Sequence, residues 1–384
     1  MIQIDGGALI DKSGLTIGAG ATLQGEATIG AATAIGGSGA IDANVSGGSL
    51  DLQGALIGST ALFIGAASGS GATLKLDGGD NADSASFTGT GGTLEIGQAG
   101  SLTLAGAESI TNGAIMLDGG TATLDASAAG LTIGSGATLE GAGIVKGSIN
   151  ASSGTIYANS QYAYGSAGGT LELKDRLTAG TLEILGEGSN TLKLDAAGDT
   201  ATNLTDSSGS GATLEIGVGA GLTLTDALNA YGSRGDAIQL DGGGATLTDA
   251  AGINFDNVGQ IRGDGAINAS TISSSYQAGN QIYESGGELD INAALTYGGA
   301  LPAGGAQLRT DFNGGGMLAL GLASGQTSTS DTVYSVQINS GVNGEGTVNI
   351  DAGVTLRRRP KSPESGDIAI RLRKLQRARK QLER

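Results

Sequence analysis

Four aspartates follow the end of an apolar run and could hold a cation: Asp77, Asp118, Asp195 and Asp241. Carboxylates and turn carbonyls are the oxygen ligands that Ca²⁺ prefers, so a row of them along one edge of a repetitive fold could bind calcium. However, the nonapeptide of calcium-binding β-rolls is missing, and Asp is common in turns because its side chain hydrogen-bonds the local backbone. The turn interpretation is favoured, and neither a metal site nor a cofactor is predicted.

Tyrosines gather at two places in the chain. Tyr157, Tyr162 and Tyr164 form one group, and Tyr276 and Tyr283 form a second group at nearly the equivalent place of a later repeat. Exposed aromatic rings over a stacked edge could hold sugar rings. The alternative, in which these segments fold their rings back over the body, is favoured. The five tyrosines are nevertheless the best candidates for ligand contact.

Catalytic constellations are missing from the sequence. There is no histidine or cysteine, and no pair of carboxylates with a basic partner, nucleophile elbow or phosphate-binding loop is visible. Thr121/Thr123 and Thr223/Thr225 could begin a flat threonine array, but the Thr-x-Thr unit does not recur at a regular spacing. The chain is therefore predicted not to be an enzyme.

The elements that would position these residues are internal repeats. Four strings return with little change: TLKLD (73–77 and 191–195), TLEIG (93–97 and 213–217), LTIGAGATLQG (15–25, as LTIGSGATLEG at 131–141) and GGTLEL (168–173, as GGELDI at 286–291). Their offsets are 118, 120, 116 and 118 residues. These offsets predict a long repeat of about 118 residues, present roughly three times.

A finer period lies inside the long repeat. Strand-like runs begin every 20–24 residues, led by Leu74, Leu94, Ile115 and Leu139, and again by Leu171, Leu192 and Leu214. Apolar and polar residues alternate within each run, and glycine pairs supply turns. This pattern predicts an all-β chain, a single-stranded parallel β-helix (β-solenoid) of about 20–24 residues per coil. A β-sandwich array is the weaker alternative, because hairpin turns would dominate it.

Composition excludes several classes of protein. Glycine supplies 73 of 384 residues with only 3 prolines, and no Gly-X-Y triplet repeats, so collagen is excluded. The absence of cysteine excludes a disulfide framework. No window is apolar enough for a transmembrane helix, and the chain begins at Met1 in strand-like sequence with no signal peptide.

Charge divides the chain into two parts. Residues 1–356 hold 9 basic and 34 acidic residues, a net charge of −25, and are predicted to be one solenoid that repels nucleic acid. Residues 357–384 hold 11 basic and 3 acidic residues. They are predicted to form a proline-containing linker and a short basic amphipathic helix. This helix caps the solenoid or contacts an acidic partner or a membrane surface, or else the segment is a translated remnant.

The repeat style resembles a known group of proteins. GSGATLEGAGIVKGSINASSGTIYA (134–158) and GGTLEIGQAGSLTLAG (91–106) resemble the glycine-rich repeats of autotransporter passengers and filamentous-haemagglutinin-like adhesins. The resemblance covers about residues 1–356 and implies a right-handed β-helix that is secreted or displayed on the outer surface of a bacterium. This sequence departs from the autotransporter pattern in holding neither a C-terminal β-barrel nor an export signal, so it is expected to be a fragment, a truncated gene product or a passenger exported by separate machinery.

Three functions are compatible with these observations. The preferred one is a non-enzymatic passenger or adhesin-type rod that binds a surface glycan or protein, or other copies of itself. A carbohydrate-active β-helix enzyme, such as a polysaccharide lyase or hydrolase, would need clustered carboxylates beside a basic residue. A calcium-stabilised matrix fibre would need the aspartate row to bind calcium.

Overall fold

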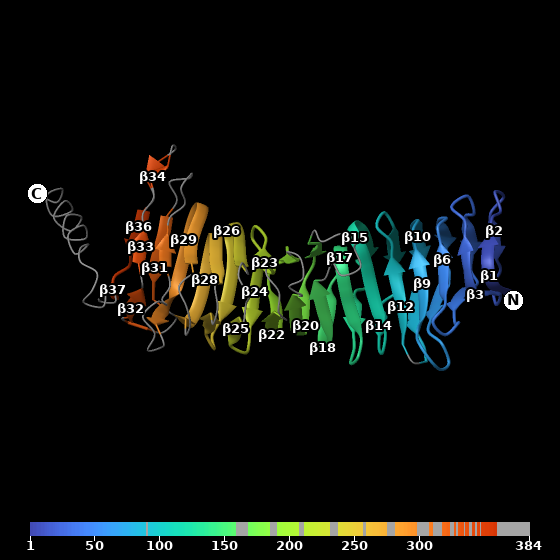
Figure 1. Cartoon of the computed structure of the whole chain (residues 1–384), viewed down its shortest axis with the longest axis horizontal. Helices are drawn as coiled ribbons and strands as arrows, with labels where there is room; N and C mark the ends of the chain where they lie inside the picture. Colours follow the sequence, from blue (N-terminus) through green and yellow to red (C-terminus); the bar gives the residue numbers. More distant parts are fainter. Residues whose placement is uncertain are drawn as a thin grey trace, which may run out of the picture.

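The protein is a long parallel β-solenoid. The computed structural model describes residues 1–89, 91–158, 168–184, 190–206, 211–230, 237–255, 259–274, 281–297, 307–309, 317–322, 326–327, 329–333, 335–337, 340–341, 344–345 and 347–358. Within these residues the strands stack one upon another from the N-terminus onward (Figure 1). Their pairings are parallel, except between β34 (Ser340–Gly341) and β35 (Gly344–Glu345). The predicted all-β solenoid is confirmed, and the predicted C-terminal helix lies outside the described residues.

Each coil contributes to three parallel sheets, which the chain visits in the order sheet 1, sheet 2, sheet 3. Strands confined to sheet 1 are β2 (Leu15–Ile17), β4 (Ile35–Gly37), β7 (Leu56–Gly58), β10 (Gly79–Ala82), β13 (Ser101–Leu104), β19 (Thr170–Leu173), β21 (Thr191–Leu194), β23 (Thr213–Ile216), β30 (Gln307–Arg309) and β33 (Ser335–Gln337). Strands confined to sheet 2 are β5 (Ala40–Ala43), β8 (Ala61–Ile64), β11 (Ser84–Phe87), β14 (Glu108–Ile110), β16 (Leu131–Ile133), β24 (Gly221–Leu224), β31 (Met317–Gly321) and β36 (Thr347–Ile350). Strands confined to sheet 3 are β6 (Ser49–Leu52), β9 (Ala72–Leu76), β12 (Gly92–Ile96), β25 (Leu228–Ala230), β27 (Ile253–Phe255), β32 (Thr329–Val333) and β37 (Val354–Arg358).

The remaining strands run round a corner and join more than one sheet. They are β1 (Ile2–Leu9), β3 (Thr22–Ile29), β15 (Ala114–Asp125), β17 (Thr138–Lys146), β18 (Ile149–Ala158), β20 (Leu177–Ile184), β22 (Asp199–Asp206), β26 (Ala237–Asp249), β28 (Gln260–Ser274) and β29 (Gln281–Tyr297). The last strand, β37, continues to Arg358, two residues beyond the predicted end of the solenoid at 356.

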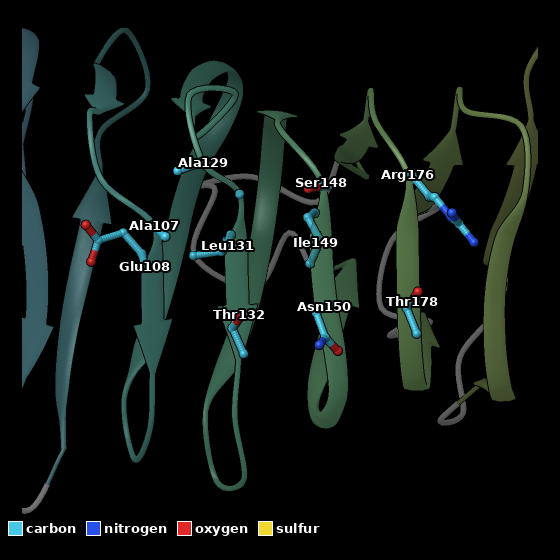
Figure 2. A pocket seen from close by; sticks show the side chains of 11 residues that line it. Ala107, Glu108, Ala129, Leu131, Thr132, Ser148, Ile149, Asn150, Arg176 and Thr178 are labelled. Carbon is cyan, nitrogen blue, oxygen red and sulfur yellow. The ribbon is translucent and has the colours of Figure 1, made fainter.

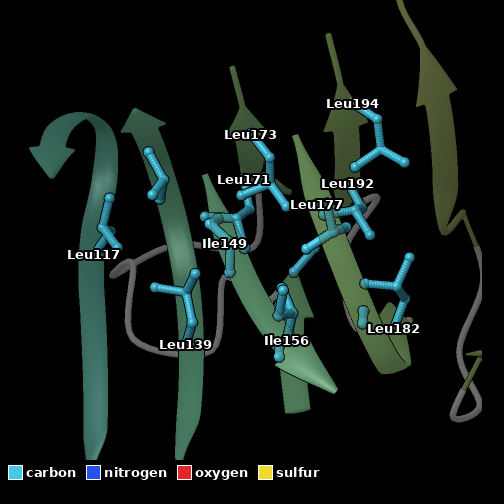
Figure 3. Packing of buried hydrophobic residues seen from close by; sticks show 14 of the residues in the cluster. Leu117, Leu139, Ile149, Ile156, Leu171, Leu173, Leu177, Leu182, Leu192 and Leu194 are labelled. Atoms are coloured by element: carbon cyan, nitrogen blue, oxygen red, sulfur yellow. The ribbon is translucent and has the colours of Figure 1, made fainter. Parts of the chain in front are cut away.

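Alternation along each strand builds the core. In β12, Leu94 and Ile96 are fully buried while Thr93 and Glu95 face outward. The inward leucines and isoleucines of successive coils stack into columns, as Leu139, Ile156 and Leu182 do (Figure 3). Because one coil cannot cover its own apolar face, burial of about 1.5–3 kcal/mol per large side chain is gained only by stacking. The result is one continuous core along the rod.

The long repeat of the sequence is not a whole number of coils. Followed onward from Leu74, the inward column of sheet 3 passes through five further coils, at Leu94, Ile115, Leu139, Ile156 and Leu182. The next strand along the chain is β21 on sheet 1, and it carries the TLKLD string of β9 again. A repeated string therefore reappears five coils and one strand later, on the next sheet round the solenoid.

Three glycines mark this rotation. Gly25, Gly141 and Gly263 have φ of 119°, 111° and 116° and lie in β3, β17 and β28, each at a different corner. A Cβ at each would stand 2.0, 2.0 and 1.9 Å from a carbonyl oxygen of the preceding coil. Only glycine fits such a corner, because both the backbone conformation and the close approach exclude a side chain.

Candidate functional site

A row of small uncharged polar side chains runs along the outside of sheet 2. It contains one residue from each of nine successive coils: Ser109, Thr132, Asn150, Thr178, Thr200, Thr223, Thr248, Asn268 and Asn292. We call these nine residues the polar ladder. Each lies between inward-facing neighbours and is partly or fully exposed. At a coil spacing of about 4.8 Å, the polar ladder presents hydroxyls and amides at regular intervals along the rod.

A groove opens over the first part of the polar ladder. It has a volume of about 410 Å³ and crosses four coils, with Thr132, Asn150 and Thr178 along it (Figure 2). Ala107, Ala129 and Gly130 leave room for it because their side chains are small or absent. The groove is thus a polar hollow that lies along the rod axis.

Glu108 and Arg176 lie at the two ends of the groove, and in Figure 2 the side chain of each points away from the middle of the groove. Glu108 is 5% exposed, and its Oε2 accepts a hydrogen bond from the Ala85 amide at 3.0 Å. Its Oε1 has no partner among the described residues. Burial raises the pKa of the Glu108 carboxyl, and the Ala85 bond offsets part of that effect.

Arg176 closes the other end. It is exposed, and its carbonyl accepts the Ile149 amide at 2.9 Å, which fixes its backbone to the preceding coil. No carboxylate of the described residues lies within 4.0 Å of its guanidinium. The groove therefore offers hydroxyls and an amide to a ligand, with a guanidinium at one end that has no carboxylate within 4.0 Å among the described residues, which is chemistry for binding polar groups.

Buried aspartates fasten neighbouring coils at two corners, Asp80 at the corner before sheet 1 and Asp199 at the corner before sheet 2. Asp80 Oδ1 accepts the Leu56 amide at 2.7 Å, and Asp199 Oδ1 accepts the Leu177 amide at 2.8 Å. The other carboxylate oxygen of each has no partner in the described part of the chain. These carboxyls satisfy backbone donors that the β-ladder leaves unpaired, which is a structural role.

A column of charged side chains lies outside sheet 1. Lys193 Nζ is 2.5 Å from Glu215 Oε1, 3.8 Å from Asp241 Oδ2 and 4.0 Å from Glu172 Oε1. The carboxylates raise the pKa of Lys193, above all through the hydrogen bond with Glu215. One lysine thus neutralises carboxylates from three coils.

Replacing Lys193 with Met should destabilise the solenoid by about 1–2 kcal/mol, because Glu215 and Asp241 lose the lysine that lies between them, while Glu172 keeps Lys174 at 2.7 Å. The effect should shrink in about 1 M salt, which screens charges beyond about 3 Å. Chemical unfolding at low and high salt measures it. Lys146→Met, at an exposed position, is the control, and an equal loss in both variants would contradict the role of the column.

The structure separates the predicted tyrosine contacts. Tyr157 is half-buried on the outside of sheet 3, in register with Glu140 and Glu183 of the adjoining coils. Tyr283 lies in the sheet 1 part of β29, in register with Arg262 and Arg309. Tyr162, Tyr164 and Tyr276 lie outside the described residues. Tyr157 and Tyr283 are therefore not on one common face.

The four aspartates also fail to form one row. Asp77 and Asp118 follow strands of sheet 3, whereas Asp195 and Asp241 follow strands of sheet 1. Asp195 pairs with Lys174 at 2.7 Å, and Asp77 lies 3.9 Å from Lys75. Among the described residues, no group of three or more Asp or Glu side chains could hold a metal ion.

The polar ladder was not found from the sequence. Thr178, Thr200, Thr223 and Thr248 stack directly although Thr-x-Thr does not recur, because a ladder needs only one threonine per coil. The irregular spacing of these residues in the sequence also obscured the polar ladder, which advances by 28 residues from Asn150 to Thr178 and by 20 from Thr248 to Asn268. Aligning the inward leucines coil by coil, rather than searching for a fixed period, would have shown it.

Comparison with known proteins adds no relative. No protein-family model matches the sequence, and neither a curated protein nor a solved structure matches the chain. In the part of the chain that the structure describes, no helix has the length and apolar character needed to span a membrane.

Proposed function

We propose that this chain is a non-enzymatic structural rod, secreted or displayed on a bacterial outer surface, that mediates adhesion or self-association. The observation that carries the proposal is the polar ladder: nine successive coils present small uncharged polar side chains on one face. The resemblance of the repeats to autotransporter passengers and filamentous-haemagglutinin-like adhesins supports the location.

Regular spacing on a stiff rod favours binding through many weak contacts. A single hydrogen bond contributes about 0.5–1.5 kcal/mol, too little to hold a partner alone. Repeating such contacts on one body makes each later contact intramolecular and multiplies the affinity. Because the stack fixes the backbone, little conformational entropy is lost on binding. A surface glycan, a surface protein or a second copy of the rod could each be held in this way.

Other parts of the chain have supporting roles in the proposal. The basic segment 357–384 contacts an acidic partner or caps the solenoid, and the five tyrosines remain predicted loop contacts. The net charge of −25 over residues 1–356 disfavours nucleic acid. No cofactor is needed.

Two stacked threonines of the polar ladder test the proposal. Thr200→Lys together with Thr223→Lys should reduce binding to glycan arrays and host-cell surfaces, or self-association in sedimentation, by about tenfold or more, since two bulky charges interrupt the row. The matched control is Thr191→Lys with Thr213→Lys, a stacked pair on sheet 1. Equal loss in both variants, or a folded rod that binds neither surfaces nor itself, would overturn the proposal and leave a spacer.

A carbohydrate-active enzyme is the second candidate, and one observation favours it. Glu108 is a buried carboxyl with a raised pKa beside a groove, as a general acid requires. Release of reducing ends from acidic or neutral polysaccharides, abolished by Glu108→Gln, would establish this function in place of the first.

A further inference from the structure

The groove between Glu108 and Arg176 is shaped for a ligand of limited length. Its ends are three coil steps apart, from β14 through β16 and β18 to β20. At about 4.8 Å per step this span is about 14 Å. Three polar-ladder residues, Thr132, Asn150 and Thr178, line it at one per step.

We propose that this groove binds an oligosaccharide segment of about three sugar rings, lying along the rod axis, with the carboxylate of a uronic acid on Arg176. This inference rests on the proposed adhesive function and names its ligand class.

The neighbouring backbone favours a glycan over a peptide. The strands beneath the groove are paired with the coils on either side: β16 with β14 and β18, and β18 with β16 and β20. Neither β16 nor β18 therefore has an open edge that could receive a peptide by strand addition. What the groove offers is side-chain hydroxyls and an amide, and these can donate to and accept from ring hydroxyls.

Arg176 supplies the specificity for a carboxylate. A guanidinium binds a carboxylate through two parallel hydrogen bonds. The guanidinium of Arg176 has no carboxylate of the described residues within 4.0 Å. The acidic body, at −25 over residues 1–356, repels a dense polyanion. The ligand is thus a mainly neutral glycan with isolated carboxylates.

Calorimetry of the full chain with defined oligosaccharides tests the inference. The probes are a neutral oligosaccharide carrying one uronic acid, its carboxyl-reduced counterpart, and a polyuronate of equal length. Arg176→Gln should weaken binding of the first probe about tenfold and leave binding of the reduced probe unchanged. Lys12→Gln removes the same charge at an exposed position of an early turn and should match the wild type.

Several results would overturn the inference. They are equal binding of the uronic acid probe by Arg176→Gln and wild type, an equal loss in Lys12→Gln, or tighter binding of the polyuronate. Because Arg176 is exposed, circular dichroism and melting should show both variants folded. If cell binding or self-association persists while no probe binds, this inference fails and the proposed function stands. If neither is observed, both fail.

Discussion

Replacing Gly141 with Ala should destabilise the solenoid by about 3 kcal/mol or more, far beyond the ordinary cost of a surface substitution. Gly141 has φ of 111°, a conformation that a side chain makes costly, and it lies where β17 turns from sheet 3 to sheet 1. A Cβ there would stand 2.0 Å from the carbonyl oxygen of Leu117. Relieving this clash would require β15 and β17 to move apart, although the two strands are hydrogen-bonded from the pair Ala114 and Thr138 onward.

Gly243→Ala is the matched control. Gly243 also lies in a strand that turns a corner, β26, but its φ is not in the left-handed region and nothing lies within 4 Å of its Cβ position. This change should alter stability by less than about 0.5 kcal/mol.

Hydrogen exchange together with thermal melting distinguishes the two variants. In a solenoid each coil contacts only its neighbours, so Gly141→Ala should lose protection first in the coils around residues 114–158 and only then along the rod. A melting temperature of Gly141→Ala equal to that of Gly243→Ala would show that the corner tolerates a side chain, and that the close approach of the coils is not what excludes one.

The fold was predictable because its signal is local and repeated. Strings such as TLKLD carry the alternation of a strand, and their return shows that one unit is used many times. Coil length was less predictable: along sheet 3 the column from Leu74 to Leu182 advances by 20, 21, 24, 17 and 26 residues. Corners absorb such differences without disturbing the stack, so the sequence period is blurred although the structural period is regular.

The rotation of the long repeat separates positions that are equivalent in the sequence. A calcium row along one edge, the less favoured interpretation of the aspartates, would need Asp77 and Asp195 on the same face. Since the repeat equals five coils and one strand, they lie on different sheets. Conversely, the polar ladder joins residues with no common motif, because stacking alone aligns them. The strand of a coil to which a residue belongs determines the face of the solenoid on which it lies, and the linear sequence does not show which strand that is.

Lowering the pH from about 7.5 to about 5 should stabilise the solenoid through Asp80 and Asp199. Burial raises the pKa of each carboxyl from 3.8 to about 6, with the backbone bonds from Leu56 and Leu177 offsetting part of the rise. Asp77 raises the pKa of Asp80 further, and Arg176 lowers that of Asp199. The geometric cause is the second carboxylate oxygen of each, buried without a partner in the described part of the chain.

The sign follows from proton linkage. Between pH 3.8 and about 6 the folded state binds more protons than the unfolded state, so the free energy of unfolding falls as pH rises. The contribution is complete below pH 3.8 and lost above about pH 6. Lowering the pH to one unit below the folded-state pKa of about 6 raises the free energy of unfolding by about 1.4 kcal/mol for each carboxyl. Asp125 acts in the opposite direction, because hydrogen bonds from Ser127 lower its pKa.

Asp199→Asn separates these contributions. Asparagine keeps an oxygen to accept the Leu177 amide and carries no charge, so it imitates the protonated acid. The variant should exceed the wild type in stability by about 1–2 kcal/mol at pH 7.5 and equal it near pH 4, as measured by chemical unfolding across the pH range. Asp226→Asn, at an exposed position, is the matched control for the change of residue type. If Asp199→Asn is instead less stable than the wild type at pH 7.5, the hydrogen bond to the ionised carboxylate stabilises the fold by more than burial of the charge destabilises it. The ionised form of Asp199 would then be the one that holds the two coils together at this corner.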